Sequence, residues 1–474
     1  MPPRPKSDER RRAGAVRALQ FGCLHIKSFP DVRCKTRAMS PENFNYIATA
    51  IFALAVLHTF VSSYFNKLAA KYPDGSPLEN LFHFLGEIEA VFGLWLIPLF
   101  YAYWASFGLD ETLAYFDSIT PKLMEPLFVI VIMVMAATRP ILKATQNLVA
   151  IASRLVPIPS ATARYYATVL AITPLLGSFI TEPAAMTISA LLLSKFLFEN
   201  KPSPHLMYIT IALLFVNVSI GGTLTHFAAP PVLMVANKWH WDINFTYMAS
   251  HFGWKAALSI FVSTSVVTTM FFREFKRLDG MPKEVPDTEP IPFWVTGVHL
   301  IALAWSVVMA HHPLLLILGF MFFFGWCIIT KEYQSELQLK PALLVGFFLA
   351  GLVTHGSLQD WWISPIIADL ESVPLFIGST ILTAFNDNAA ITYLSTLALD
   401  QGFSSPFSEM GLKKYAIVAG AVTGGGLTII ANAPNPAGNA ILSKYFPGGS
   451  VNPGKLFLFA LPFTIIAALC FMLL

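Results

Sequence analysis

Long apolar segments separated by short polar stretches recur from about residue 44 to Leu474. Each apolar run is continuous, as in membrane helices, whereas a transmembrane β-strand alternates apolar and polar positions. The candidate spans are 44–65, 84–107, 125–149, 204–236, 250–272, 293–311, 313–330, 341–357, 413–445 and 455–474. The pattern predicts an all-α polytopic membrane protein with about ten transmembrane helices. Composition agrees, because only 12% of the residues are charged, against roughly 25% in soluble domains.

A polar stretch rich in charge and proline, REFKRLDGMPKEVPDTEP, divides the spans into two groups of five. The sequence therefore predicts a first transmembrane repeat over 44–272, a linker over 273–292 and a second repeat over 293–474. Residues 1–43 form a basic tail, whose first 38 residues hold ten Lys or Arg and three acids. The tail is either a disordered surface or targeting arm or a start-site artefact, since translation could begin at Met39.

Four segments do not fit ordinary spans. Residues 204–236 and 413–445 are each 33 long, about 50 Å if helical against a hydrocarbon core of ~30 Å. Both have Gly- and Pro-rich centres, GGTLTHFAAPP and GGGLTIIANAPNP, so we expect broken helices. Residues 164–199 and 374–400 are too short for two crossings, and each carries a polar tip, TEP or NDN. We expect re-entrant hairpins there.

These hairpins and broken helices match between the two halves. TEPAAMT (181–187) aligns with NDNAAIT (386–392), and GGTLT (221–225) aligns with GGGLT (424–428) at nearly the same spacing. Two matches in the same order indicate an internal repeat. Because five crossings is an odd number, the second half enters the membrane from the opposite face. The sequence therefore predicts inverted-topology repeats, as in many secondary transporters.

Loop charges predict the orientation. Eleven Lys or Arg residues lie in loops on the linker's side and four on the other side. The positive-inside rule therefore places the linker in the cytoplasm, in a bacterial-type plasma (inner) membrane. The basic tail contradicts this orientation, and we give the loops more weight.

Acids at the hairpin tips are the candidate chemistry. A carboxylate inside a bilayer costs at least ~2.5–3.5 kcal/mol and usually faces a functional site. Carboxylates, amide and hydroxyl oxygens and free carbonyls together suit a small hard cation such as sodium. The candidate cation- and proton-binding residues are Glu182, Asp387, Asn386, Asn388, Thr181, Thr187, Thr392, Thr223, Thr225, Thr428, Asn432 and Asn435. The expected hinge glycines are Gly221, Gly222, Gly424, Gly425 and Gly426.

A site that holds either a proton or a cation, never both, exchanges the two by competition. Low dielectric favours the protonated acid, and a bound cation favours the ionised one. The alternative is structural: carboxylates also stabilise helix N-termini, so each acid could simply cap the half-helix that begins at its tip. His226 is a candidate proton relay, although its repeat partner is Ile429. An intramembrane enzyme would need a catalytic dyad, and the symmetric placement of the acids argues against one.

Hairpin tips followed by the GGTLTHFAAPP segment resemble the ion transporter superfamily. It includes arsenite permeases, sodium-coupled dicarboxylate and citrate symporters, and NhaD-type sodium/proton antiporters. The resemblance covers roughly 44–474 and is closest to the sodium/proton antiporters. It implies a scaffold and a transport domain in each half, a homodimer, and elevator-like alternating access. The dicarboxylate symporters carry Ser-Asn-Thr at each tip, whereas this chain has Thr-Glu-Pro and Asn-Asp-Asn.

Two fixed negative charges would repel an anionic substrate, so we expect exchange of sodium, or lithium, for protons at a midplane carboxylate site. The alternative is a proton- or sodium-coupled anion permease of the dicarboxylate or arsenite type, for which Arg139 is the candidate anion-binding cation. We expect no cofactor beyond the transported Na+ and H+, no transition metal and no enzymatic activity. The expected partners are membrane lipid, small cations and a second copy of the chain, but not nucleic acid.

Overall fold

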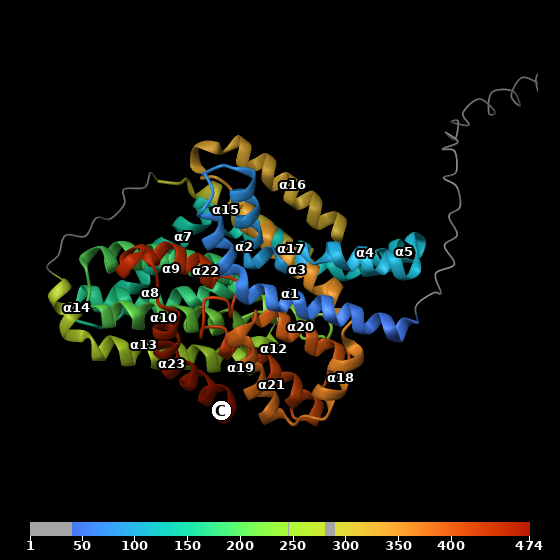
Figure 1. Cartoon of the computed structure of the whole chain (residues 1–474). Helices are drawn as coiled ribbons and strands as arrows, with labels where there is room; N and C mark the ends of the chain where they lie inside the picture. Colours follow the sequence, from blue (N-terminus) through green and yellow to red (C-terminus); the bar gives the residue numbers. More distant parts are fainter. Residues whose placement is uncertain (1–39, 245, 280–289) are drawn as a thin grey trace, which may run out of the picture. The chain divides into compact units, whose positions relative to one another are not determined.

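The structure is a computed structural model that describes residues 40–244, 246–279 and 290–474 (Figure 1), and every regular element in this part is helical. The predicted all-α class is confirmed. The expected tail lies outside the described residues up to residue 39. In the first half the helices are α1 (Pro41–Ala69), α2 (Pro77–Gly86), α3 (Val91–Leu94), α4 (Leu96–Phe107), α5 (Leu109–Ile119), α6 (Met124–Ala136), α7 (Arg139–Leu155), α8 (Ala161–Ile180), α9 (Glu182–Phe196), α10 (Pro204–Gly221), α11 (Pro230–Ala236), α12 (Thr246–Met248), α13 (Trp254–Met270) and α14 (Phe272–Leu278).

The second half holds nine further α-helices within the described residues. They are α15 (Phe293–Val308), α16 (Pro313–Ile329), α17 (Leu339–Gly356), α18 (Asp360–Ala368), α19 (Ser372–Phe385), α20 (Asn388–Ala398), α21 (Glu409–Gly424), α22 (Asn435–Leu442) and α23 (Pro453–Leu473). Five helical stretches of the described chain are long and apolar enough to cross a membrane, and two bent pairs raise the number to seven. The ten expected spans are therefore not all single long helices, since α15 and α16 have only 16 and 17 residues.

Two expected spans are interrupted, so their predicted boundaries are wrong. The segment 84–107 is divided among α2, a 3₁₀ turn η1 (Ile88–Ala90), α3 and α4, with a bend of 112° between Pro77–Gly86 and Val91–Phe107. The segment 125–149 ends a helix at Ala136 and starts another at Arg139. Thr138 there is extended and Pro140 lies in the first turn of α7, where proline begins a helix readily.

Both expected broken helices are broken at their glycines. In the first half α10 ends at Gly221, a 3₁₀ turn η4 (Gly222–Leu224) follows, and α11 begins at Pro230. In the second half α21 ends at Gly424 and α22 begins only at Asn435. Glycine lowers the cost of leaving a helix, and proline near the start of the next helix removes one N–H that would lack a partner.

Each expected hairpin is a pair of helices that meet at a polar tip. In the first, α8 and α9 pack against each other and join at Thr181. In the second, α19 and α20 join at Asn386 and Asp387, and α19 packs mainly against α21. The two acids therefore lie at helix starts, at the ends of their hairpins.

Around the tips, each half of the chain packs against the hairpin of the other half. The short helix after each break packs on the second arm of the other half's hairpin: α22 on α9, side by side in Figure 1, and α11 on α20. The broken helices also cross, where Ser219 Oγ donates to the carbonyl of Val422 at 2.7 Å. A Cβ added at Gly426 would lie 2.4 Å from the Val216 Cα. Only glycine permits this approach.

α10 lies at the centre of this arrangement. In an apolar 18-residue stretch of Pro204–Leu224, 94% of the residues are buried. The corresponding shares are 33% in Pro453–Leu473 and 39% in Glu42–Ser62. It packs against α8, α13, α21 and α23. The long apolar helices therefore differ in burial: α10 contacts protein on nearly all sides, whereas α1 and α23 keep large exposed apolar faces.

The expected linker begins as an ordered element. α14 covers its first residues, and the carboxylate of Glu274 accepts hydrogen bonds from the Ser203 N–H and hydroxyl at 2.6 and 2.8 Å. Asp279 accepts from the Thr162 N–H at 2.7 Å. Residues 280–289, the remainder of the charged stretch, lie outside the described residues.

A second close approach holds α3 against α17. A Cβ added at Gly351 would lie 2.4 Å from the carbonyl carbon of Phe92, a backbone atom that cannot rotate away. One added at Gly93 would lie 2.4 Å from the Phe347 ring. These two glycines fix the position of η1, which immediately precedes α3.

We predict that Gly351→Ala destabilises the protein, because overpacking typically costs ~1–3 kcal/mol. The matched control is Gly325→Ala in α16, where an added Cβ meets nothing within 4 Å and alanine favours the helix. Thermal unfolding followed by size-exclusion chromatography should show a midpoint several degrees lower for Gly351→Ala only. Equal midpoints for the two variants would contradict the close approach.

Candidate functional site

Glu182 is the most enclosed acid of the site. It is the first residue of α9 and is 0% exposed. Its Oε2 accepts a hydrogen bond from Asn432 Nδ2 at 2.9 Å. Its Oε1 has no hydrogen-bond partner among the described residues, and a Cβ added at Gly222 would lie 2.5 Å from it. Gly222 therefore gives this carboxylate its space.

The partner of Glu182 comes from the other half of the chain. Asn432 lies in the irregular segment between α21 and α22, and α22 packs on α9. This packing, with Gly438 of α22 against Met186 of α9, brings the segment to the first hairpin tip. The sequence named both residues as candidates, but their hydrogen bond across 250 positions follows only from the exchanged packing of the halves.

Asp387 is held differently. It is the N-cap of α20, where Oδ1 accepts from the Ala389 N–H at 2.8 Å, and it is 8% exposed. The structural alternative considered from sequence therefore applies to Asp387. For α9 the N-cap is Thr181, which makes no side-chain cap bond, so Glu182 is not the N-cap of its helix. The two acids are close enough to repel each other electrostatically.

The first tip carries backbone strain. Thr181 has φ 75° and ψ 151°, a region that costs a non-glycine residue about 1–3 kcal/mol and that concentrates at functional sites. The second tip is unstrained: Asn386 is extended, and its Oδ1 accepts from the Asp387 N–H at 2.9 Å. The tips match in sequence position but differ in conformation.

Polar atoms without partners gather around the tips. Buried polar groups in proteins are nearly always hydrogen-bonded, so each exception needs an explanation. Among the described residues, the unpartnered buried atoms on the predicted site residues are Thr181 Oγ1, Glu182 Oε1, both amide atoms of Asn388, Asn432 Oδ1 and Asn435 Oδ1. Five of these six atoms are oxygens, the ligand type that small hard cations prefer. The same oxygens suit sodium as a cargo ion.

The predicted threonines bind backbone carbonyls. Thr225 Oγ1 donates to Ser178 O in the first hairpin at 2.5 Å, and Thr428 Oγ1 donates to Ala384 O in the second at 2.8 Å. The remaining donors and acceptors are Thr223 to Ile220 O, Thr187 to Pro183 O, and Thr392 to Asn388 O and Ala389 O. A hydroxyl that donates its hydrogen keeps its lone pairs, and these remain available to a cation.

The predicted glycines let the broken helices touch their hairpins. A Cβ added at Gly221 would lie 2.5 Å from Pro174 O of α8, and one at Gly424 would lie 2.4 Å from Thr380 O of α19. One added at Gly425 would lie 2.9 Å from the Asn388 amide. These glycines are needed for close packing. Their predicted role as hinges concerns motion and stays a prediction.

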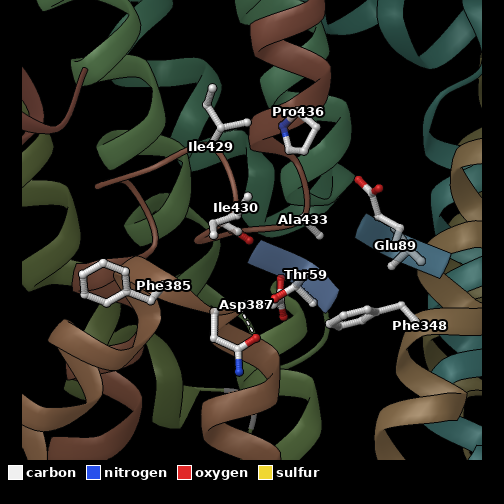
Figure 2. A pocket seen from close by; sticks show the side chains of 12 residues that line it. Thr59, Glu89, Phe348, Phe385, Asp387, Ile429, Ile430, Ala433 and Pro436 are labelled. Atoms are coloured by element: carbon white, nitrogen blue, oxygen red, sulfur yellow. Dashed lines mark hydrogen bonds between the residues drawn. The ribbon is translucent and has the colours of Figure 1, made fainter. Parts of the chain in front are cut away.

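A pocket adjoins the second tip. The space free of protein atoms in this partly open pocket is about 460 Å³, open solvent included, and Figure 2 shows Asp387 and Glu89 both on its wall. It is lined by Thr59, Glu89, Val345, Phe348, Phe385, Asn386, Asp387, Ile429, Ile430, Asn432, Ala433 and Pro436. Glu89 was not predicted from the sequence as a site residue. Its only signal was a second acid, beside Glu87, in a segment that looked like a continuous span.

Two further candidates lie away from this pocket. His226 is half-buried with its ring 5.3 Å from that of Phe227, and it is not among the residues that line the pocket. Arg139 donates to the carbonyl of Glu332 at 3.4 Å and is likewise absent from the pocket wall. The structure therefore brings together Glu182, Asp387 and Asn432, whereas the candidate relay and the candidate anion-binding cation do not line this pocket.

Comparison with known proteins agrees with the prediction of a transporter. Residues 43–474 match the family described as "Putative Na+/H+ antiporter", while a search of curated proteins finds no match. The match extends over nearly all of the chain and, together with the long apolar helices, makes this an integral membrane protein. The chain belongs to this family of Na+/H+ antiporters.

Proposed function

We propose that this protein exchanges sodium, or lithium, for protons by alternating access at one site built from Glu182, Asp387 and Asn432. The observation that carries the proposal is the fully enclosed Glu182 carboxylate, whose Oε1 has no partner among the described residues. A bare carboxylate there is costly, because the protein offers one hydrogen bond in place of its hydration. Either a proton or a small cation removes that cost.

Competition then couples the two ions. While a proton occupies a carboxylate, the site has lost the charge that a cation needs, and a bound cation in turn disfavours the proton. Electrostatic repulsion between Glu182 and Asp387 further favours a state in which at least one of them is neutralised. Neutral ligands would come from Asn386 and Asn388, with Thr181, Thr187, Thr223, Thr225, Thr392 and Thr428 as further oxygen donors.

Alternating access is supported by matched contacts in the two halves. Thr225 and Thr428 each donate to a carbonyl of their own hairpin, and Gly221 and Gly424 each approach a carbonyl of its first arm. We infer that the halves are inverted repeats and that each hairpin moves with its broken helix. Homodimerisation and a plasma-membrane location remain parts of the same proposal.

An anion permease is less well supported. No basic side chain lines the pocket beside Asp387 within the described part of the chain, and Arg139 bonds elsewhere. Two acids without a basic partner would repel an anion. The residues around the tips therefore favour a cation as cargo.

The proposal is tested by cation-triggered collapse of a pH gradient in everted vesicles from cells that lack their own antiporters. We expect sodium or lithium to collapse the gradient with the wild type, and Asp387→Asn and Glu182→Gln each to abolish the response, because both remove a charge that must alternate between proton and cation. The matched control is Asp369→Asn, an exposed acid of the second half. Its response should equal that of the wild type at equal expression.

Potassium and choline provide the cation controls in these vesicles. Full activity of both tip variants would contradict the carboxylate site. A well-folded wild type that responds to no cation would contradict the exchange of sodium or lithium itself.

Asn432 generates a second prediction. A ligand that binds the folded state raises the unfolding temperature, so sodium should raise that of the purified wild type by several degrees. Asn432→Ala removes the hydrogen bond to Glu182 and should abolish the shift. Asn439→Ala, a nearby asparagine on α22 outside the pocket, is the matched control and should keep it. An unchanged sodium shift in Asn432→Ala would exclude this residue from the site.

A further inference from the structure

The pocket beside the second tip contains a carboxylate that the proposed exchange does not use. Glu89 belongs to η1, between α2 and α3, and lines the same pocket as Asp387. Figure 2 shows the two acids with Thr59 drawn between them in this view. The charges of Glu89 and Asp387 are close enough to interact. Glu89 comes from the first half of the chain and Asp387 from the second.

Glu89 is more exposed than the two tip acids and is near in sequence to a surface ion pair. Its neighbour Glu87 pairs with Lys340 at 2.9 Å, and the Lys340 side chain is 76% exposed. Glu89 itself is half-buried, Asp387 is 8% exposed and Glu182 is 0% exposed. The exposure of the acids thus falls from Glu89 to Asp387 and then to Glu182. Lys340 bonds Glu87 and is also close enough to Glu89 to interact with it electrostatically, but it forms no ion pair with Glu89 in the part of the chain that the structure describes.

A second observation points to a ligand in this pocket. Asn432 lines it and is 1% exposed, and its Oδ1 has no hydrogen-bond partner among the described residues, while its Nδ2 is committed to Glu182. Thr59 contributes a hydroxyl that donates to Val56 O at 2.7 Å and keeps its lone pairs. Residues that carry two carboxylates, an amide oxygen and a hydroxyl oxygen therefore line one cavity. Oxygen donors with net negative charge suit a monovalent hard cation.

The close approach of α3 and α17 makes this position rigid. Gly93 and Gly351 allow α3 to touch α17, and α17 supplies Val345 and Phe348 to the pocket wall. The packing of α3 on α17 therefore positions the backbone that carries Glu89. A purely structural acid in a helix break would not need to line a cavity opposite a second unpaired acid.

We propose that Glu89, with Asp387 and Asn432 Oδ1, forms an outer cation subsite through which sodium or lithium reaches the enclosed site at Glu182. The subsite rests on the proposed function, since it assigns the access route of that same cargo. Glu89 raises the local cation concentration near the pocket, and the cation then moves from Glu89 to Asp387. Glu89 is not the group whose protonation is exchanged, so its loss should affect affinity more than maximal rate.

Exchange kinetics separate these roles. A cleft lined by one sign of charge raises the local counter-ion concentration by ten-fold or more, so Glu89→Gln should raise the KM for sodium about tenfold and leave the maximal rate within about twofold. Glu89→Asp should restore most of the affinity. The matched control is Glu87→Gln, which breaks only the surface pair with Lys340 and should keep the wild-type KM. A wild-type KM in Glu89→Gln would overturn the subsite.

A chemical readout does not depend on exchange. In a background with its four cysteines replaced by serine, Glu89→Cys and Glu87→Cys are reacted with the cationic thiol reagent 2-(trimethylammonium)ethyl methanethiosulfonate on purified protein. We expect reaction at both positions. Sodium at more than ten times the wild-type KM, compared with choline at equal ionic strength, should slow only the reaction at position 89, because Asp387 and Asn432 remain to bind the ion.

The two proposals fail in different ways. If the wild type exchanges no cation yet sodium still protects position 89, the subsite stands and the exchange proposal fails. If exchange occurs but position 89 does not react, or sodium slows both positions equally, the subsite is overturned and the exchange proposal stands.

Discussion

The arrangement of the tips depends on one constraint, the cost of enclosing a carboxylate in an apolar core. Glu182 is fully buried, and the effective cost of removing such an ion from water is several kcal/mol. The protein supplies a single hydrogen bond, from Asn432, and leaves the second oxygen without a partner among the described residues. A satisfied structural acid would have both oxygens bonded. The incomplete coordination therefore gives the site a use for a proton or a cation.

The exchanged packing of the halves follows from the same constraint. Asn432 reaches Glu182 because α22 lies on α9, and that packing requires the chain to leave helix geometry after Gly424. Gly222 leaves room for the carboxylate, and Gly426 lets α10 pass the second break. The second half thus completes the tip of the first half. Glu182 would lose its Asn432 partner if the two halves separated, whereas Asp387 and Asn386 have their hydrogen bonds within the second half.

The sequence predicted the helical class, the two breaks and the two acidic tips, because each rests on local chemistry: apolar length, glycine and proline, and an acid in an apolar run. It did not predict the helix break at Thr138, although Thr138, Arg139 and Pro140 interrupt the apolar run there. It also missed Glu89, and could not pair Asn432 with Glu182, because these depend on contacts between distant segments. For Asp387 the sequence left ion binding and helix capping as alternatives, and the geometry shows that it is the N-cap of α20.

The most direct test of competition at one site is proton release from purified protein in weakly buffered detergent solution. Adding sodium or lithium to the wild type should release protons, with the amount falling as the starting pH rises and the carboxylates are already ionised. Choline should release none, and the double variant Glu182→Gln/Asp387→Asn should release none with any cation. Sodium that binds the folded wild type without releasing a proton, or equal release from the double variant, would contradict the account.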